Sequence, residues 1–322
     1  MGIMLPACYT RRPGHKNGRM ATHTSDLIEY LAKGGCKARV VSISRLVEVE
    51  SALIGLKRSG AISANFYPEL TKYLNFDYKP ALPEARSIIV VASPQPPTRV
   101  LFDDYAVIIP PTYIYSVIWE KQLNLVTDYL QPRGYRVARA RLPYKTLAVR
   151  SGLGRYGRNN ICYIPGMGSF HRFGAFYSDL PCEDDGWHAP EVMKLCKTCK
   201  LCMDKCPTEC IPADRFLIYA DRCLTHFNES ENPIPAWINP DWHNALLGCM
   251  VCQKVCPLNK DSLEKIQDAV EKFSKVETDE ILAGTTQENL RPATITKLES
   301  LCLADIDIYP LLKRNLSLLL NG

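Results

Sequence analysis

The chain has 322 residues, 46% of them hydrophobic and 23% charged, with a formal net charge of +5 at pH 7. These values are typical of a globular protein with a sizeable core, and the mild positive charge by itself indicates only solubility. The longest apolar runs, such as SIIVVAS at 87–93, have the length of a strand, which excludes a membrane-spanning helix. No hydrophobic export segment follows Arg11 and Arg12, so we expect a cytoplasmic protein with no membrane attachment.

Helix and strand patterns alternate through the first part of the chain. Apolar residues at helical spacing predict helices at 24–34, 46–57 and 113–130. Runs rich in β-branched and aromatic residues predict strands at 37–43, 85–93, 135–142 and 172–180. The alternation predicts an α+β protein in which residues 1–190 form an α/β domain around one sheet.

Two cysteine runs follow this domain. The first has the spacing C-x2-C-x2-C-x3-C-P, and the second has C-x2-C-x3-C-P; their members are Cys196, Cys199, Cys202 and Cys206, then Cys249, Cys252 and Cys256. Disulfide frameworks belong to short secreted chains, whereas closely spaced thiolates select zinc or iron–sulfur clusters. Zinc ribbons separate two C-x2-C pairs by about 15 to 20 residues. Because the first run instead matches the bacterial ferredoxin pattern, it predicts [4Fe–4S] clusters.

The cysteines can be assigned to two clusters of four ligands each. The second run lacks the first cysteine of the pattern, since Leu246 stands there, and Cys223 between the runs is the candidate replacement. One cluster then takes Cys196, Cys199, Cys202 and Cys256, and the other takes Cys206, Cys223, Cys249 and Cys252. We expect residues 191–262 to form a ferredoxin-like double [4Fe–4S] domain and 263–322 a short helical C-terminal segment. The remaining cysteines, among which Cys210 is a weaker spare-ligand candidate, should be small buried residues: Cys8, Cys36, Cys162, Cys182, Cys210 and Cys302.

A glycine-rich stretch, SGLGRYGRNNICY at 151–163, lies between two predicted strands. It fits G-x-G-x-x-G by letter, but its position in the middle of the chain is not that of a dinucleotide-binding fingerprint. It is either a plain glycine-rich turn or a loop whose backbone N–H groups and Arg158 approach an anionic or amide-bearing cofactor.

Residues 148–182, AVRSGLGRYGRNNICYIPGMGSFHRFGAFYSDLPC, together with the eight cysteines resemble the epoxyqueuosine reductase family, whose core is related to corrinoid-containing reductive dehalogenases. The resemblance implies that the α/β domain binds cobalamin noncovalently and that the clusters reduce its cobalt. It also implies a corrinoid-binding loop and pocket wall made of Gly152, Leu153, Gly154, Gly157, Arg158, Asn159, Ser169 and Phe173.

The chain departs from the family pattern at the expected proton donor. The family places an aspartate about fourteen residues before the G-L-G element, and Ala138 stands at that position here. Tyrosine and histidine can act as general acids. The candidate catalytic residues are therefore Tyr115, Tyr144 and His171, whereas His243, in an incomplete D-x-H-x-x-G match, is expected to be structural.

Several functions remain open at this point. About 60 residues follow Asn259, without a basic and aromatic surface, so we expect tRNA not to be a partner. The first hypothesis is a cobalamin-dependent iron–sulfur reductase of a small substrate, supplied by an external donor of ferredoxin or flavodoxin type. The alternatives are an activator that reduces Co(II) to Co(I) on a partner corrinoid protein, an epoxyqueuosine reductase with a substituted acid, and a cluster-only module that docks a partner.

Overall fold

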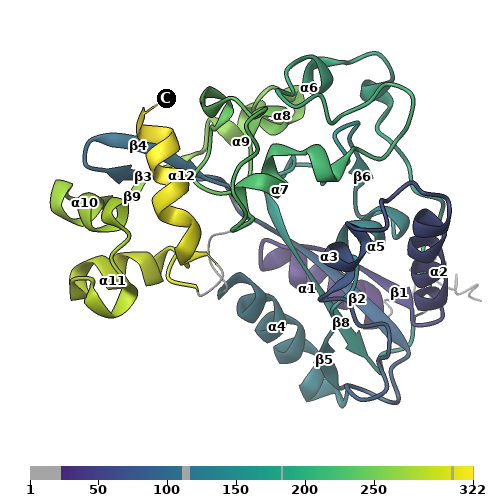
Figure 1. Ribbon diagram of the computed structural model, residues 1–322. Helices are drawn as coiled ribbons and strands as arrows, with labels where there is room; N and C mark the ends of the chain where they lie inside the picture. The colour runs from purple at the N-terminus through teal and green to yellow at the C-terminus, as the bar shows by residue number, and fades with distance from the viewer. Residues whose placement is uncertain (1–22, 111–116, 183, 306–307, 322) are drawn as a thin grey trace, which may run out of the picture.

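The computed structural model describes residues 23–110, 117–182, 184–305 and 308–321 (Figure 1). Its main sheet has the strand order β1-β2-β8-β5, and every neighbouring pair is antiparallel. The strands are β1 (Lys37–Ser42), β2 (Ser87–Pro94), β8 (His171–Ser178) and β5 (Val137–Arg139). The mixed α and β architecture predicted from the sequence is confirmed.

Helices cover both faces of this sheet, which makes three layers. The centre is β2, because its alternate side chains Ile88, Val90 and Ala92 face one core while Ile89 and Val91 face the other. The first core also holds residues of α2 (Arg45–Arg58) and α5 (Tyr144–Arg150), and the second holds residues of α1 (His23–Lys33) and α4 (Val117–Leu130). A continuous apolar run therefore forms a strand that is buried on both sides.

The helices follow from local sequence patterns. In α1, Leu27 and Leu31 are one turn apart and both fully buried. The short α3 (Tyr67–Thr71) has Pro68 in its first turn, where the missing N–H costs nothing. The part of the predicted third helix at 113–116 lies outside the described residues, as does Tyr115. The predicted strand 135–142 is shorter in the structure, because after Ala140 the chain turns through Pro143 into α5.

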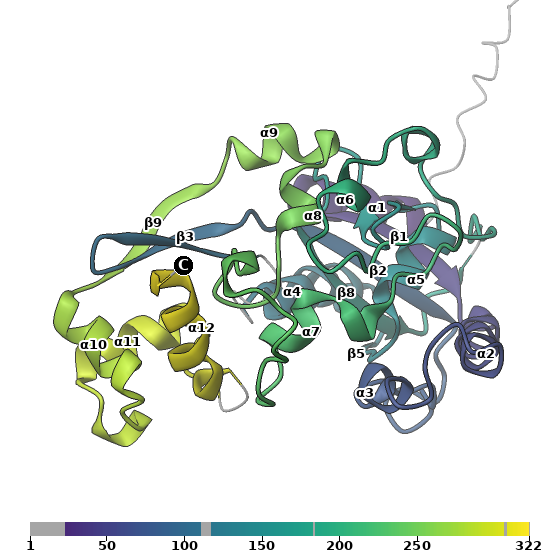
Figure 2. The ribbon, with the colours of Figure 1, turned by 45° about the horizontal axis from the view of Figure 1, so that its top comes forward.

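A second, three-stranded sheet lies apart from the first. The hairpin of β3 (Thr98–Phe102) and β4 (Tyr105–Ile109) pairs with β9 (Gln267–Phe273), which runs parallel to β3. Its core is shared with α10 (Lys275–Ala283), α11 (Pro292–Ser300) and α12 (Tyr309–Asn321). Figure 2 shows this unit beside the larger three-layer body. The C-terminal segment, which we expected to be helical, holds α10, α11 and α12 and also this strand, because the open edge of β3 supplies backbone hydrogen bonds to 267–273.

The cysteine-rich segment is built from single turns of helix. These turns are α6 (Leu201–Asp204), α7 (Leu224–Asn228), α8 (Val251–Lys254) and α9 (Lys260–Leu263). A small two-stranded sheet, β6 (Arg155–Tyr156) with β7 (Cys162–Tyr163), precedes the segment. Arg314 of α12 donates to the carbonyls of Phe227, Asn228, Ser230 and Asn232 at 2.7–3.3 Å, so the C-terminal helix holds α7 in place. None of the helices described is long and apolar enough to cross a membrane.

Candidate functional site

Four of the predicted cluster ligands line one pocket. Cys196, Cys199 and Cys202 come from the turn before α6 and from α6 itself, and Cys256 follows α8. Cys202 interacts electrostatically with the other three thiols. The turns α6 and α8 pack against each other, as Figure 1 shows, and this contact brings cysteines far apart in sequence to the same pocket.

The other four predicted ligands form a second group beside the first. Cys249 interacts with both Cys206 and Cys223, and Cys252 interacts with Cys223 and Cys249. Cys252 also interacts with Cys202, which belongs to the first group. The thiols thus gather in the two groups of four that the spacing predicts. That each group holds one cluster stays a prediction.

The other described cysteines lie mainly in the interior. Cys36, Cys162 and Cys210 are buried as expected, whereas Cys182 and Cys302 are partly exposed. The Cys210 Sγ lies 3.6 Å from the Cys206 Sγ, so this thiol contacts the second group without being needed to complete it. Cys8 is outside the part of the chain that the structure describes.

The spacing of the thiols distinguishes a cluster from a single metal ion. Across the described residues, no three His, Cys, Asp or Glu side chains are close enough together to hold one ion. A tetrahedral zinc site would bring its thiolates to about 3.8 Å from one another, given its short Zn–S bonds. A cubane separates its four ligands by more, because they bind different corners of a larger body. The preference for [4Fe–4S] clusters over zinc rests on the ferredoxin-like spacing of the first cysteine run.

The glycine-rich loop reaches the first thiol group. Arg158 donates to the Cys196 carbonyl from Nε at 3.2 Å and from Nη2 at 2.6 Å. The Asn159 amide donates to the Tyr163 hydroxyl at 3.0 Å and to the Cys252 carbonyl at 3.5 Å. The Tyr163 hydroxyl is within hydrogen-bonding reach of the Cys256 thiol. Arg158 and Asn159, which we expected to contact a corrinoid, thus contact the cysteine-rich segment. Their role toward cobalamin stays a prediction.

Two glycines of the loop are required by close packing. A Cβ on Gly154 would lie 2.7 Å from the Cys162 Sγ and 2.8 Å from the Tyr163 carbonyl oxygen. A Cβ on Gly157 would lie 2.6 Å from the Tyr163 ring. Any side chain at either position would displace the β7 backbone or the ring beside the thiols. The glycines therefore let two layers of the loop approach each other.

Ser169, expected in the corrinoid pocket wall, lies at the contact with the cysteine-rich segment. Its hydroxyl donates to Gln253 Oε1 at 2.9 Å, and its backbone N–H donates to Asn259 Oδ1 at 2.8 Å. Asn259 returns a hydrogen bond to the Ser169 hydroxyl at 2.8 Å and is fully buried. This network fixes the turn before β8 against the end of α8.

The His171 imidazole is buried and neutral. Burial lowers the pKa of His171 to about 4, and its Nε2–H donates to the Cys162 carbonyl at 3.0 Å. Its Nδ1 is buried without a hydrogen-bond partner in the described structure, and the ring packs on Phe173. A neutral imidazole cannot act as a cationic proton donor near pH 7, but its Nδ1 can accept a hydrogen bond.

The other described catalytic candidate, Tyr144, begins α5. Its hydroxyl donates to the Ala140 carbonyl at 3.0 Å, and burial raises the pKa of Tyr144. Its catalytic role stays a prediction. His243, expected to be structural, is buried, and neither ring nitrogen has a hydrogen-bond partner among the described residues.

Sequence reasoning missed two ionisable residues with shifted pKa values, Lys145 near the second thiol group and Glu229 at the end of α7. Lys145 on α5 interacts electrostatically with both Cys162 and Cys223, and desolvation lowers its pKa. Glu229 directly follows α7, and desolvation raises the pKa of its carboxyl to about 8. Both residues are exposed at the surface. No local motif in the sequence distinguishes either residue, because the pKa of each is set by its three-dimensional surroundings.

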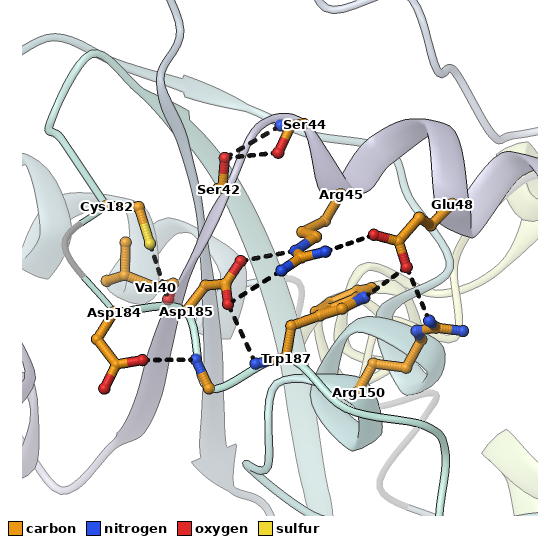
Figure 3. Close-up of polar contacts among 11 residues, drawn as sticks. Val40, Ser42, Ser44, Arg45, Glu48, Arg150, Cys182, Asp184, Asp185 and Trp187 are labelled. Carbon is orange, nitrogen blue, oxygen red and sulfur yellow. Dashed lines mark hydrogen bonds and ion pairs between the residues drawn. The ribbon is translucent and has the colours of Figure 1, made fainter.

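A cluster of polar contacts holds the end of α5 (Figure 3). Glu48 accepts hydrogen bonds from Arg45 at 2.6 Å, Trp187 at 2.9 Å and Arg150 at 3.0 Å. The Arg45 hydrogen bond holds the pKa of Glu48 below its ordinary value. Because Arg150 is two residues before Gly152, this cluster anchors the start of the glycine-rich loop.

The fold and the two thiol groups define a class of protein, one that carries a pair of iron–sulfur clusters beside an α/β domain. Residues 195–259 match the 4Fe-4S double cluster binding domain. The prediction of two [4Fe–4S] clusters is thereby confirmed at the level of the domain.

Within that class, the chain is similar to epoxyqueuosine reductases. The sequence is 26% identical over 211 residues to the enzyme of Staphylococcus aureus, covering 61% of this chain and 54% of that one. It is 25% identical over 250 residues to the enzyme of Bacillus subtilis, covering 73% and 63%. The resemblance predicted from the sequence is confirmed, although the chain spans only 54% and 63% of the lengths of these two relatives.

Solved structures of epoxyqueuosine reductases have the same fold. A Bacillus subtilis structure, with its catalytic aspartate loop swung out of the active site, matches with a TM-score of 0.66 at 23% identity, over 92% of this chain and 80% of that one. A structure with an epoxyqueuosine-modified tRNA-Tyr stem loop matches with a TM-score of 0.65 at 22% identity, over the same shares. The expectation that tRNA is not a partner, which rested on the short C-terminal segment and on the missing aspartate, was wrong, because these relatives are epoxyqueuosine reductases and one was solved with a tRNA stem loop.

Proposed function

We propose that the chain is an oxidoreductase that reduces epoxyqueuosine in tRNA, with two [4Fe–4S] clusters and noncovalently bound cobalamin. The observation that carries the proposal is the pair of four-thiol groups next to an α/β domain that resembles epoxyqueuosine reductases in sequence and fold. A small-molecule reductase, our first hypothesis from the sequence, has less support because these relatives are epoxyqueuosine reductases. The corrinoid activator has no specific observation in its favour.

We place the proposed cobalamin site beside Lys145 and His171, which both approach Cys162, with Lys145 also interacting with Cys223. Corrinoids carry carboxamide side chains, which need both hydrogen-bond donors and acceptors. The buried His171 Nδ1 is an acceptor without a partner among the described residues, and the Lys145 ammonium is a donor beside Cys162 and Cys223. These residues fit the periphery of a corrinoid. Cobalamin, when bound, would supply a strongly reducing cobalt.

The chain's own residues would then bind the clusters, orient the cysteine-rich segment and donate a proton. The eight cysteines hold the clusters, and Arg158 and Tyr163 orient the segment that carries Cys196 and Cys256. Glu229 is the proposed proton donor in place of the aspartate missing at Ala138, because its raised pKa keeps a proton on the carboxyl at neutral pH. Ala138 itself lies on β5, paired with Tyr177.

The test is a defined reaction without oxygen. Protein loaded with iron, sulfide and cobalamin should bind about eight irons and one cobalt per chain, as two cubanes and one corrinoid require. It should then convert epoxyqueuosine in purified tRNA to queuosine, measured by mass spectrometry of the nucleosides. Protein without cobalamin is the control and should form none. A fully loaded protein that forms no queuosine would exclude the proposed substrate.

A further inference from the structure

Aliphatic side chains are exposed around the pocket of the first thiol group. Leu195, Leu201 and Leu258 line this pocket and are 44%, 44% and 43% exposed, and nearby Val192 is 40% exposed. Leucines and valines in the described part of the chain are mostly buried, so four exposed ones beside one pocket form an apolar patch. Such a patch with a polar rim is typical of a surface that binds another protein.

Lysines surround this apolar patch. In the run KLCKTCKLC at 194–202 a lysine recurs at every third position, giving Lys194, Lys197 and Lys200, all of which are exposed. Lys260 is exposed beside Cys256 and Pro257, where it lines a neighbouring hollow. Segments 192–205 and 254–265 contain seven lysines against three acidic residues, a net charge of +4 in a chain whose total is +5. These two segments are therefore net positive.

We propose that the patch of Val192, Leu195, Leu201 and Leu258, with its lysine rim of Lys194, Lys197, Lys200 and Lys260, binds an acidic one-electron carrier protein. The inference rests on the proposed function, which needs an outside source of electrons. In the complex the carrier is oxidised by one electron, and the cluster held by Cys196, Cys199, Cys202 and Cys256 is reduced from the 2+ to the 1+ state. Opposite charges accelerate the encounter, and the apolar centre holds the docked carrier.

The geometry gives the electron a direction. The patch is at the surface, and the first thiol group lies directly under it. Cys252 of the second group interacts with Cys202 of the first, and Cys223 of the second interacts with Lys145 in the proposed cobalamin site. The electron path therefore runs from the carrier to the first thiol group, then to the second thiol group, and then to the proposed cobalamin site.

The chemistry of the patch favours a protein over RNA. RNA-binding surfaces combine cations with aromatic rings on which bases stack. Here the four exposed apolar side chains are aliphatic, and aliphatic side chains give bases no stacking platform. Lysines around an aliphatic centre instead complement a carrier whose redox centre is ringed by carboxylates.

The test is the rate at which a reduced carrier reduces the clusters of the loaded full-length chain. Reduced flavodoxin and reduced plant-type ferredoxin, both acidic, would be mixed with it in a stopped-flow instrument at several salt concentrations. Lys197→Glu with Lys200→Glu should slow both carriers about tenfold or more at low salt, and the difference should shrink at high salt. Leu258→Gln should slow both carriers at all salt concentrations.

The matched control is Lys79→Glu with Lys121→Glu, which reverses two exposed charges in the α/β domain and should leave the rates unchanged. Iron content and complete reduction by dithionite show that each variant holds its clusters. Unchanged carrier rates in K197E/K200E, or equal slowing in the control, would overturn the proposal. Weakened binding of tRNA with unchanged carrier rates would assign the surface to RNA instead. If the wild-type chain is inactive on tRNA but K197E/K200E still slows cluster reduction by the carrier, the proposed substrate is rejected and the proposed docking surface is supported.

Discussion

At the scale of single residues, the most consequential group is the carboxyl of Glu229. It directly follows α7, and desolvation by the neighbouring protein raises its pKa to about 8. A carboxylic acid that stays protonated at neutral pH can deliver a proton that an ordinary glutamate has already lost. Under the proposed function, this carboxyl would supply the proton that the family's aspartate supplies, since Ala138 stands at the position where the resemblance places that aspartate.

Glu229→Gln should abolish most queuosine formation while leaving iron and cobalt content unchanged. Loss of a general acid typically lowers a rate by about 10²–10⁴-fold. In the wild type, activity should be present below pH 8 and fall as the pH rises through about 8, where the carboxyl loses its proton. The neighbouring Glu231→Gln is the control. Full activity in the Glu229 variant would assign the proton to another group.

The same carboxyl has a consequence for stability that does not depend on catalysis. Between the ordinary glutamate pKa of 4.5 and about 8, the folded protein keeps a proton that the unfolded chain releases. The free energy of unfolding should therefore decrease as pH rises through this window. Glu229→Gln should remove that decrease, measured by urea unfolding at pH 6 and pH 8.5. An identical pH dependence in variant and wild type would contradict the raised pKa.

Tyr163 offers a test of the loop's contact with the clusters. Its hydroxyl is within reach of the Cys256 thiol, and a donated hydrogen bond stabilises the reduced, more negative cluster. Tyr163→Phe should lower the reduction potential of the cluster that Cys256 holds by about 40 mV, which corresponds to about 1 kcal/mol for one electron. A redox titration followed by electron paramagnetic resonance measures this. Tyr156→Phe, whose hydroxyl contacts Thr146 instead, is the control.

At the scale of elements, the glycine-rich loop has a role in close packing as well as in the candidate functional site. Gly154→Ala should destabilise the protein by about 2–4 kcal/mol, because the added carbon would lie 2.7 Å from both the Cys162 Sγ and the Ile164 side chain. Gly55→Ala in α2 is the control, since nothing lies within 4 Å of an added carbon there. It should be neutral or stabilising by up to about 1 kcal/mol. Thermal unfolding of the loaded protein distinguishes the two, and equal midpoints would contradict this account.

Elements with a strong local pattern were predictable from the sequence, and those made by distant partners were not. The buried β2 and the helices α1 and α2 carry their own apolar periodicity, so their predicted bounds differ from the observed ones by one or two residues. By contrast, β9 forms only because β3, more than 160 residues earlier in the chain, has an open edge. Tertiary pairing there overrides a local sequence, QDAVEKF, with little strand character of its own.

Some residues of the candidate site were likewise predictable from the sequence, and others were not. Cluster ligands were predictable because the fixed size of a cubane imposes a local spacing on cysteines. Lys145 and Glu229 were not, since each is defined by what lies across from it in space. The roles assigned by resemblance to Arg158, Asn159 and Ser169 also depended on three-dimensional neighbours, and these residues contact the cysteine-rich segment.

At the scale of the whole molecule, the cysteine-rich segment is held between two bodies. On one side it contacts the α/β domain through Ser169 and Asn259, and on the other α12 fastens it through Arg314 and Asn315. Its own helices are single turns and provide little core. The segment therefore depends on its neighbours and on its clusters for a defined structure.

Arg314→Ala should loosen α7 without removing any ligand. Its guanidinium donates to four backbone carbonyls, and leaving these unsatisfied should cost about 2–4 kcal/mol of stability. Hydrogen exchange at 224–232 should accelerate. Lys313→Ala, which removes one exposed hydrogen bond to Ala283, is the control and should cost less than about 1 kcal/mol. Unchanged exchange at 224–232 in the Arg314 variant would contradict the anchoring role.

The pairing of β9 with β3 has a consequence for how the protein is made. Each thiol group draws on both cysteine runs, so neither is complete until the ribosome has passed Cys252 and Cys256. The strand and helices that close over the hairpin are translated after that point. On a nascent chain, all eight thiols are therefore translated before β9 can pair with β3 and complete the last body.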